Sequence, residues 1–347
     1  MEQTVYIGID YHQHFLQICV LDRAGAVLCN RRCDNSLAEL LPTVSDVVNA
    51  RNVDKVGNGS VTRIHAAIEA GCGSADLAEA LTVAGWSVSL AHAGYVSRIR
   101  QSPDKTDFSD ARLLADLTRV GYLPCVWLAP TVVRELRALV RERQSLADER
   151  RRIKQQIRGQ LREHRQRTNL RAWTKAWFIW LNNEAELGEQ GRWIVNRRIR
   201  HLDMLCEEIE TVEARLREVT IGDAVIERLL RQSGIGEVTA WTLRAEIGRF
   251  DRFRTGKQLS RFCGLSPRNA SSGERTADAG MIKAGQPQLR AILIEAAHRL
   301  AMHDPRWKAF HAQLKARGKP GSVIAAAIAN RWVRGLLHEM KELPAMT

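Results

Sequence analysis

The feature that most constrains the fold is a change in sequence pattern near residue 131. Before that point, short apolar runs rich in β-branched residues alternate with stretches whose apolar residues recur at helical spacing. After it, the apolar stripes have helical spacing. Strands that alternate with helices are typical of a sheet covered by helices. We therefore predict an α/β domain followed by an all-α region.

The first part predicts a mixed sheet. Strand-like runs occupy residues 4–9, 15–21 and 26–29, and Asp22-Arg23-Ala24-Gly25 between the last two is typical of a hairpin turn. The pattern then continues as helix, strand, helix, strand and helix at residues 36–50, 64–68, 75–84, 88–90 and 107–119.

Residues 131–171 are strongly basic, with 13 Arg or Lys against 5 Asp or Glu. Their apolar residues form one stripe of a long helix, and a second amphipathic helix is expected at about 193–219. A Trp-rich segment separates the two helices, which predicts an antiparallel coiled-coil arm. Basic residues on a helix are often only solvated, but such a surplus on one element favours nucleic-acid contact.

The remainder is predicted to be helical. Ser233-Gly234-Ile235-Gly236 lies between two apolar helical runs, the pattern of a helix–hairpin–helix element whose glycines let backbone amides approach a phosphate. Residues 264–288 are expected to form a loop, and helices are expected at 289–302 and 321–341. We place the domains at 1–125, 126–220 and 221–347.

The net charge is +13 and the pI about 9.8, which favours a polyanionic partner. No apolar run is long enough to span a bilayer, and the first residues do not resemble a signal peptide, so we expect no membrane partner and a cytoplasmic, nucleoid-associated protein. The seven cysteines are scattered and complete no zinc-binding set, which indicates reduced thiols.

Four carboxylates stand out by position. Asp10 and Glu69 end predicted strands, and Asp107 and Asp110 lie on the first turn of a predicted helix. Singly, each could cap a turn or complement a helix dipole. Together in a basic chain, they predict a site for Mg²⁺ or Mn²⁺, because hard oxygen ligands suit these ions. Gly8-x-Asp10 before a hairpin is also the layout of ribonuclease-H-like nucleases.

His12 and His14 suggest a transition-metal site, but His-x-His with no third nitrogen or sulfur ligand is common in plain strands. We therefore do not include either histidine among the predicted ligands.

At this point the motifs resemble a known family. Gly8-Ile9-Asp10, Ile68-Glu69-Ala70 and Lys105-Thr106-Asp107-x-x-Asp110-Ala111-Arg112 resemble those of the DEDD transposases of bacterial insertion sequences, the insertion-sequence one-ten family with its eleven-eleven branch. The second half is similar to the C-terminal domain of that family in Gly234-Ile235-Gly236, Phe262-x-Gly264-Leu265-x-Pro267-Arg268, Ser272-Gly273 and Lys283-x-Gly285-x-x-x-Leu289-Arg290. Gly280 and Ile282 depart from the arginine and serine usual there.

The resemblance implies a RuvC-like N-terminal domain, a coiled-coil linker and a helical C-terminal transposase domain. It implies that the four acids hold Mg²⁺ and that Ser272 forms a covalent phosphoserine link to DNA. It also implies an element-encoded guide (bridge) RNA that pairs with double-stranded donor and target DNA, and a dimeric to tetrameric homo-oligomer. The residues expected to contact nucleic acid are Lys105, Arg150, Arg151, Arg152, Arg268, Lys283 and Arg290.

From the residues alone, Ser271 could be the nucleophile as well as Ser272, and most serines in glycine-rich loops are turn residues. Two other functions also remain open. One is a Holliday-junction-type nuclease that uses the acids with water as the nucleophile. The other is an RNA-binding protein whose active site has decayed.

Overall fold

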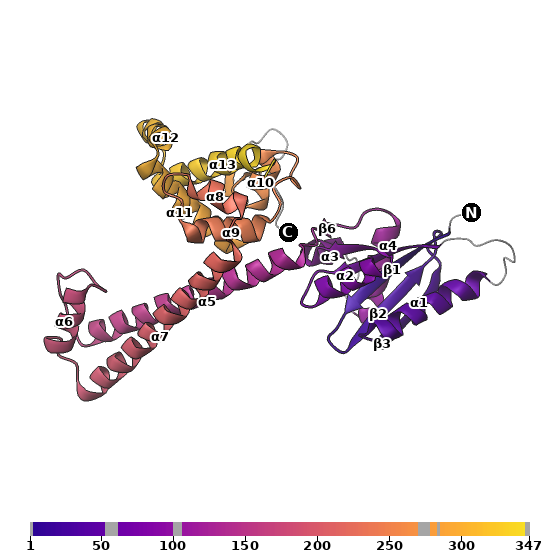
Figure 1. Cartoon of the computed structure of the whole chain (residues 1–347), viewed down its shortest axis with the longest axis horizontal. Helices are drawn as coiled ribbons and strands as arrows, with labels where there is room; N and C mark the ends of the chain where they lie inside the picture. Colours follow the sequence, from indigo (N-terminus) through magenta and orange to yellow (C-terminus); the bar gives the residue numbers. More distant parts are fainter. Residues whose placement is uncertain (1–2, 53–61, 100–105, 270–277, 283–284, 344–347) are drawn as a thin grey trace. The chain divides into compact units, whose positions relative to one another are not determined.

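The computed structural model describes residues 3–52, 62–99, 106–269, 278–282 and 285–343 (Figure 1). The chain divides into two compact units, residues 1–129 and 130–347, and each is described by itself. None of the described helices is long and apolar enough to cross a lipid bilayer.

The first unit is built on a six-stranded mixed sheet in the order β3-β2-β1-β4-β5-β6. The central strand β1 pairs with β2 antiparallel and with β4 parallel, and β4 pairs with β5 parallel. The predicted α/β domain with a mixed sheet is therefore confirmed. The strands are β1 (Gln3–Tyr11), β2 (Phe15–Leu21), β3 (Val27–Asp34), β4 (Thr62–Glu69), β5 (Ser87–Ala91) and β6 (Cys125–Val126).

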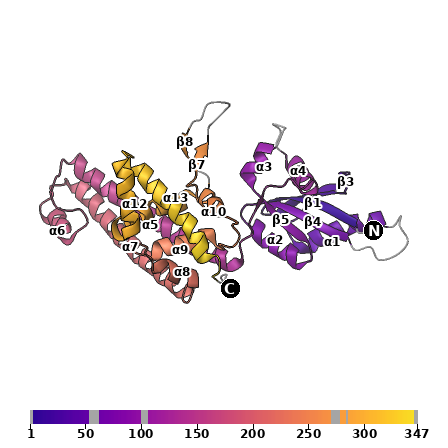
Figure 2. The same cartoon turned by 90° about the horizontal axis from the view of Figure 1, so that it is seen from above.

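Helices cover both faces of this sheet (Figure 2). On one face, Val5, Ile7 and Ile9 of β1 pack against α1 (Leu37–Asn52) and α2 (Ser74–Val83). The other face is covered by α3 (Ala93–Ile99) and α4 (Asp107–Arg119), which pack on small residues such as Ala67. Because side chains alternate between the faces of a strand, Gly8 and Asp10 belong to the α4 face.

The second unit begins with two long helices, α5 (Thr131–Glu163) and α7 (Glu189–Val219), which lie side by side with the shorter α6 (Lys175–Asn183) at one end (Figure 1). Their contacts run in opposite senses: Arg143 pairs with Glu213, and Arg198 donates to the carbonyl of Gln156. The two helices are therefore antiparallel. Their core contains Ile157, Leu202 and the indole rings of Trp177 and Trp180.

The rest of this unit is a helical domain centred on α13 (Gly321–Met340), whose Ile328, Trp332 and Leu336 are buried. The segment 264–288, predicted to be only a loop, also contains an antiparallel pair of short strands that extends from the helices (Figure 2). The elements of this domain before α13 are α8 (Ala224–Leu230), α9 (Glu237–Ile247), α10 (Gly256–Phe262), β7 (Pro267–Asn269), β8 (Asp278–Met281), α11 (Pro287–His303) and α12 (Pro305–Ala316).

The glycine-containing turn between α8 and α9 packs against another helix. Gly234 has φ +84°, and a Cβ there would lie 3.1 Å from the backbone of Arg299 in α11. At Gly236, an added Cβ would meet nothing within 4 Å. Gly234 therefore serves packing, and Gly236 is the position of this turn that remains open.

Candidate functional site

A close contact between strand and helix places the acidic residues. A Cβ at Gly8 would lie 1.8 Å from the carbonyl oxygen of Ala111 and 2.5 Å from the amide nitrogen of Ala115. Only glycine therefore lets the backbone of α4 lie directly on β1. This contact brings the first turn of α4 to the end of β1, where Asp10 lies.

The start of α4 is fixed by a capping box. The hydroxyl of Thr106 accepts a hydrogen bond from the Ser109 amide at 3.2 Å, and the Thr106 amide donates to the Ser109 hydroxyl at 3.3 Å. Because this cap sets where the helix begins, Asp107 and Asp110 both fall on its first turn. Asp110 is 7% exposed, and Asp107 is partly exposed.

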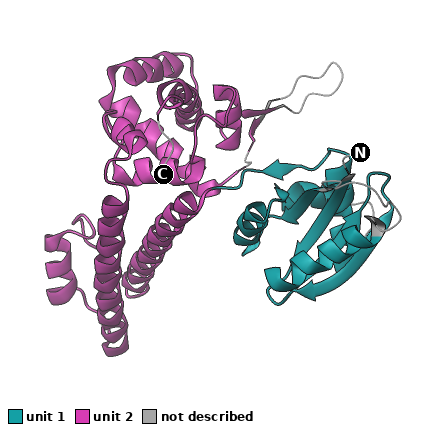
Figure 3. Cartoon of the chain, turned by 45° about the vertical axis from the view of Figure 1, so that its right-hand side comes forward, with its two compact units in different colours: residues 1–129 teal, residues 130–347 magenta. Residues whose placement is uncertain are grey.

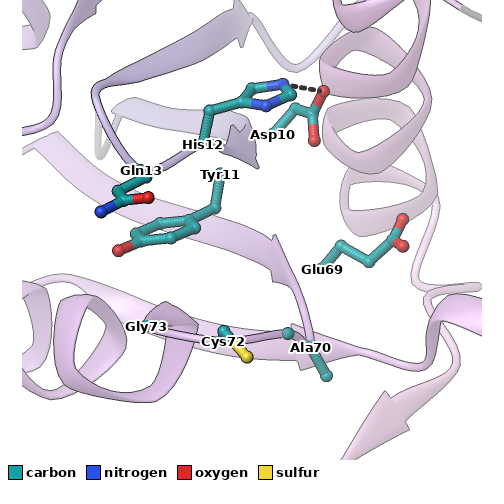
Figure 4. Close-up of a pocket in the computed structure, with 9 residues that line it drawn as sticks. Asp10, Tyr11, His12, Gln13, Glu69, Ala70, Cys72 and Gly73 are labelled. Atoms are coloured by element: carbon teal, nitrogen blue, oxygen red, sulfur yellow. Dashed lines mark ion pairs between the residues drawn. The ribbon is translucent and has the colours of Figure 1, made fainter.

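Strand pairing brings Glu69 beside Asp10. Ile9 of β1 pairs with Ile68 of β4 in parallel register, so the next residue of each strand projects to the same face of the sheet. Asp10 and Glu69 line one pocket, together with the loop that follows β4 (Figure 4).

A histidine lies among these acids. Nε2 of His12 is 3.4 Å from Oδ2 of Asp10 and 3.5 Å from Oδ1 of Asp107. One potential ligand atom from each of the three residues lies within 4.8 Å of the others. The His12 ring stacks on Phe15, and Arg32 covers Phe15 and pairs with Asp107 at 3.3 Å.

The electrostatics of this cluster favour a cation. Burial raises the pKa of Asp10, the nearby His12 opposes that rise, and the like charges of Asp110 and Asp107 increase it. Asp10 is thus within electrostatic reach of both acids of α4. Gathering these negative charges is costly unless a cation neutralises them, and carboxylate oxygens suit a divalent ion.

The buried Nε2 of His12 also fits a metal site. It is inaccessible to solvent and faces the carboxylates of Asp10 and Asp107. The structure thus joins Asp10 and Asp107 with His12, puts Asp110 near Asp10 and sets Glu69 on the neighbouring strand. Sequence reasoning left His12 out. The available signal was its position two residues after Asp10, on the same face of an extended chain.

Other predicted site residues lie elsewhere. Arg268 is exposed on β7, and Arg290 is partly buried in the first turn of α11. Lys105, Ser272 and Lys283 lie outside the described residues.

The predicted arm arginines have acidic neighbours on their own helix. Arg151 pairs with Asp148 at 2.6 Å, and Arg152 pairs with Glu149 at 3.0 Å. Arg150 lines a hollow on α5 together with Arg158, Lys154 and the indole of Trp173. The ammonium of Lys154 lies 5.1 Å from the centre of that ring. A basic surface that carries an aromatic ring therefore lies on this part of the arm.

Comparisons with known proteins match both halves of the chain. A family model for the DEDD transposases of IS110 elements, described as "Transposase", matches residues 7–165. A second, described as "Transposase IS116/IS110/IS902 family", matches residues 226–312.

Curated relatives agree with these models. "Putative transposase y4qE" of Sinorhizobium fredii is 30% identical over 251 residues. The matched region is 65% of this chain and 62% of that protein, so the chain spans less than two thirds of the length of this relative. The transposase for insertion sequence element IS1111A of Coxiella burnetii is 25% identical over 339 residues, 95% of this chain and 88% of its own length. The transposase for insertion sequence element IS1328 of Yersinia enterocolitica is 24% identical over 339 residues, which are 96% of this chain and 96% of its own length.

The N-terminal match takes in all four acids, from Asp10 to Asp110, and the C-terminal match takes in most of the helical domain. These are the two halves in which the motifs resembled the insertion-sequence one-ten family. The chain belongs to the IS110 family of insertion-sequence transposases.

Proposed function

We propose that this chain is a DNA recombinase that cuts and rejoins the strands of an insertion sequence and its target. The observation that carries the proposal is the acidic cluster: β1, β4 and α4 bring carboxylates together in a basic chain of a transposase family. The order β3-β2-β1-β4-β5, with only β2 reversed between its neighbours, supports a RuvC-like, ribonuclease-H-like assignment for the first unit.

Asp10, Glu69, Asp107 and Asp110 are proposed to hold Mg²⁺, or Mn²⁺ in its place. The cation, when bound, supplies positive charge that polarises the scissile phosphate. The acids bind and orient it, and Arg32 limits the negative charge of Asp107. The fit rests on the donor set and on the raised pKa of Asp10, which reflects burial beside like charges.

Ser272 is proposed as the nucleophile, on the family motif alone. Its hydroxyl oxygen forms a bond to phosphorus while the bond from phosphorus to the departing DNA oxygen breaks, and that oxygen gains a proton. The covalent link conserves the phosphodiester energy, so rejoining needs no ATP. Arg268, Lys283, Arg290 and Lys105 are proposed to contact the phosphates, because guanidinium and ammonium groups stabilise the charge that develops there.

The partners are proposed from the family as well. They are double-stranded donor and target DNA, an element-encoded guide RNA, and further copies of this chain in a dimer or tetramer. The arm, with Arg150, Arg151 and Arg152, is proposed to contribute to nucleic-acid binding and to assembly, in the cytoplasm beside the nucleoid. The net charge of +13 supports a polyanionic partner.

The test is a search for a covalent protein–DNA adduct. Labelled target DNA is incubated with the protein, its guide RNA and Mg²⁺, and the products are separated on a denaturing gel. Wild type should form the adduct, and Ser272→Ala should bind RNA and DNA normally but form none. Asp10→Asn, Glu69→Gln, Asp107→Asn and Asp110→Asn should each form no adduct.

Ser271→Ala is the matched control and should retain the adduct. An adduct that survives in Ser272→Ala and disappears in Ser271→Ala would move the nucleophile by one residue. Free DNA ends without an adduct in wild type would instead favour a structure-selective nuclease that uses water. Full activity in excess EDTA would contradict the metal site.

A further inference from the structure

The imidazole of His12 is directed at the acids and held there. It follows Asp10 by two residues, and its Nε2 lies 3.4 Å from the Asp10 carboxylate (Figure 4). The same atom lies 3.5 Å from the Asp107 carboxylate. The ring stacks on Phe15, with centroids 4.4 Å apart and planes 22° apart. The guanidinium carbon of Arg32 lies 3.7 Å from the centre of the Phe15 ring. This packing fixes the orientation of the imidazole.

The spacing of these atoms suits ligands of one ion. In an octahedral site with bonds of 2.1 Å, neighbouring ligand atoms are about 3.0 Å apart and opposite ones about 4.2 Å. Nε2 of His12 lies 3.4 Å from the nearer Asp10 oxygen and 3.5 Å from the nearer Asp107 oxygen, and both distances fall between these values. Nε2 is inaccessible to solvent and faces these two carboxylates. A ligand nitrogen needs a free lone pair, which this position can present.

We infer that His12 is a nitrogen ligand of the divalent cation at this site, and that it makes the site favour Mn²⁺ over Mg²⁺. The inference rests on the proposed metal site and goes beyond its four carboxylates. Mg²⁺ strongly prefers oxygen ligands and gives up its water reluctantly. Imidazole binds the transition metals better, so one nitrogen among carboxylates shifts the preference towards Mn²⁺.

A purely electrostatic role for His12 would use the same contacts. As a charged partner of Asp10 and Asp107, His12 would stabilise the cluster without bonding to the ion. The two roles differ in one observable, because only a bonded nitrogen couples magnetically to bound Mn²⁺. The test therefore measures that coupling rather than activity.

The experiment adds Mn²⁺ alone to the full chain and records pulsed electron paramagnetic resonance spectra. Wild type should show a nitrogen coupling, and its frequency should change when the protein is labelled with ¹⁵N-histidine. His12→Phe keeps a ring against Phe15 but offers no nitrogen, so the coupling should vanish. His14→Phe, at an exposed position two residues along, should keep it.

Calorimetric titrations give a second measure. His12→Phe should weaken Mn²⁺ binding by at least about tenfold. Loss of a residue that only hydrogen-bonds to a metal ligand already lowers metal affinity by that factor, and loss of the ligand itself should lower it at least as much. Mg²⁺ binding should weaken less, so the ratio of the two affinities should fall. Unfolding curves of the metal-free variants establish that His12→Phe is folded.

The outcomes separate this inference from the proposed site. Mn²⁺ binding without a nitrogen coupling in wild type would overturn the role of His12 and leave the four-acid site standing. A coupling that persists in His12→Phe would assign it to another residue. Absence of specific Mn²⁺ binding in wild type would contradict the proposed metal site itself, and this inference with it.

Discussion

Gly8 positions the site through the side chain it lacks. The backbone of α4 occupies the space that a Cβ would need, 1.8 Å from the Ala111 carbonyl oxygen. Gly8→Ala should therefore push α4 off the sheet and lower the free energy of unfolding by about 3 kcal/mol, the upper end of the cost of overpacking. Urea unfolding of the two proteins measures this difference.

Gly71→Ala is a suitable comparison, because an added Cβ there would meet nothing within 4 Å. Its free energy of unfolding should stay within about 0.5 kcal/mol of wild type. Equal stability of the Gly8→Ala and Gly71→Ala variants would mean that α4 is not held by this contact.

Asp10 should make the metal-free protein less stable as the pH rises. Burial and the nearby charges of Asp110 and Asp107 raise its folded-state pKa above the ordinary value of 3.8. The folded state then holds the proton more tightly than the unfolded state, so stability is lost as the pH rises from 3.8 through the raised pKa. Asp10→Asn cannot lose that proton and should be more stable than wild type at pH 7 in EDTA.

Denaturant unfolding at pH 4 and pH 7 tests this. The stability difference between Asp10→Asn and wild type should grow with pH, while groups common to both proteins cancel. A difference that shrinks as the pH rises would show that ion pairing with His12 outweighs the repulsion and burial.

The arm carries its charge in a partly neutralised form. Arg151 and Arg152 each pair with an acid one turn earlier on α5, Asp148 and Glu149. Exposed pairs of this kind are weak, so a phosphate can replace the carboxylates. Changing Arg150, Arg151 and Arg152 to Gln should reduce the slope of log affinity for duplex DNA against log salt by up to about three units.

The opposite change provides the control for the arm. Asp148→Asn combined with Glu149→Gln should strengthen DNA binding, because it removes two competing carboxylates from the same surface. Fluorescence anisotropy across a salt series measures both variants. Slopes that are unchanged in both would show that this face of α5 does not contact DNA.

At the level of elements, the sequence predicted most of the sheet and the two long helices, because their apolar periodicity is strong. It did not predict β7 and β8, because β7 has only three residues and begins with a proline, and the four residues of β8 include Gly280. The neighbours of Asp10 were predicted from strand ends and one helical turn. The position of His12 beside Asp10 was not predicted, because its spacing from Asp10 was only a weak signal and the stacking on Phe15 that orients its ring is a contact of the folded chain.

At the level of the whole molecule, each hydrophobic cluster of the described residues lies within one of the two units (Figure 3). We therefore expect residues 1–129 to fold alone, with a single cooperative unfolding transition. This fragment contains every residue of the acidic cluster, so it should bind Mn²⁺ as tightly as the full chain. Circular dichroism and calorimetry test this, with the Asp10→Asn fragment as the non-binding control.

Loss of Mn²⁺ binding in a folded fragment would mean that the second unit supplies a ligand. A fragment that does not fold would mean that the units depend on each other for stability.

The parallel pairing of β1 with β4 has a consequence for synthesis on the ribosome. Asp10 emerges early, but its partners Glu69 and Asp107 lie far along the chain, and a parallel pair needs a crossover between its strands. No two of these acids can meet before β4 has left the ribosome, and α4 comes later still. We therefore expect a growing chain to lack a complete metal site until α4 has emerged, and a gene copy interrupted before α4 to encode a product without one.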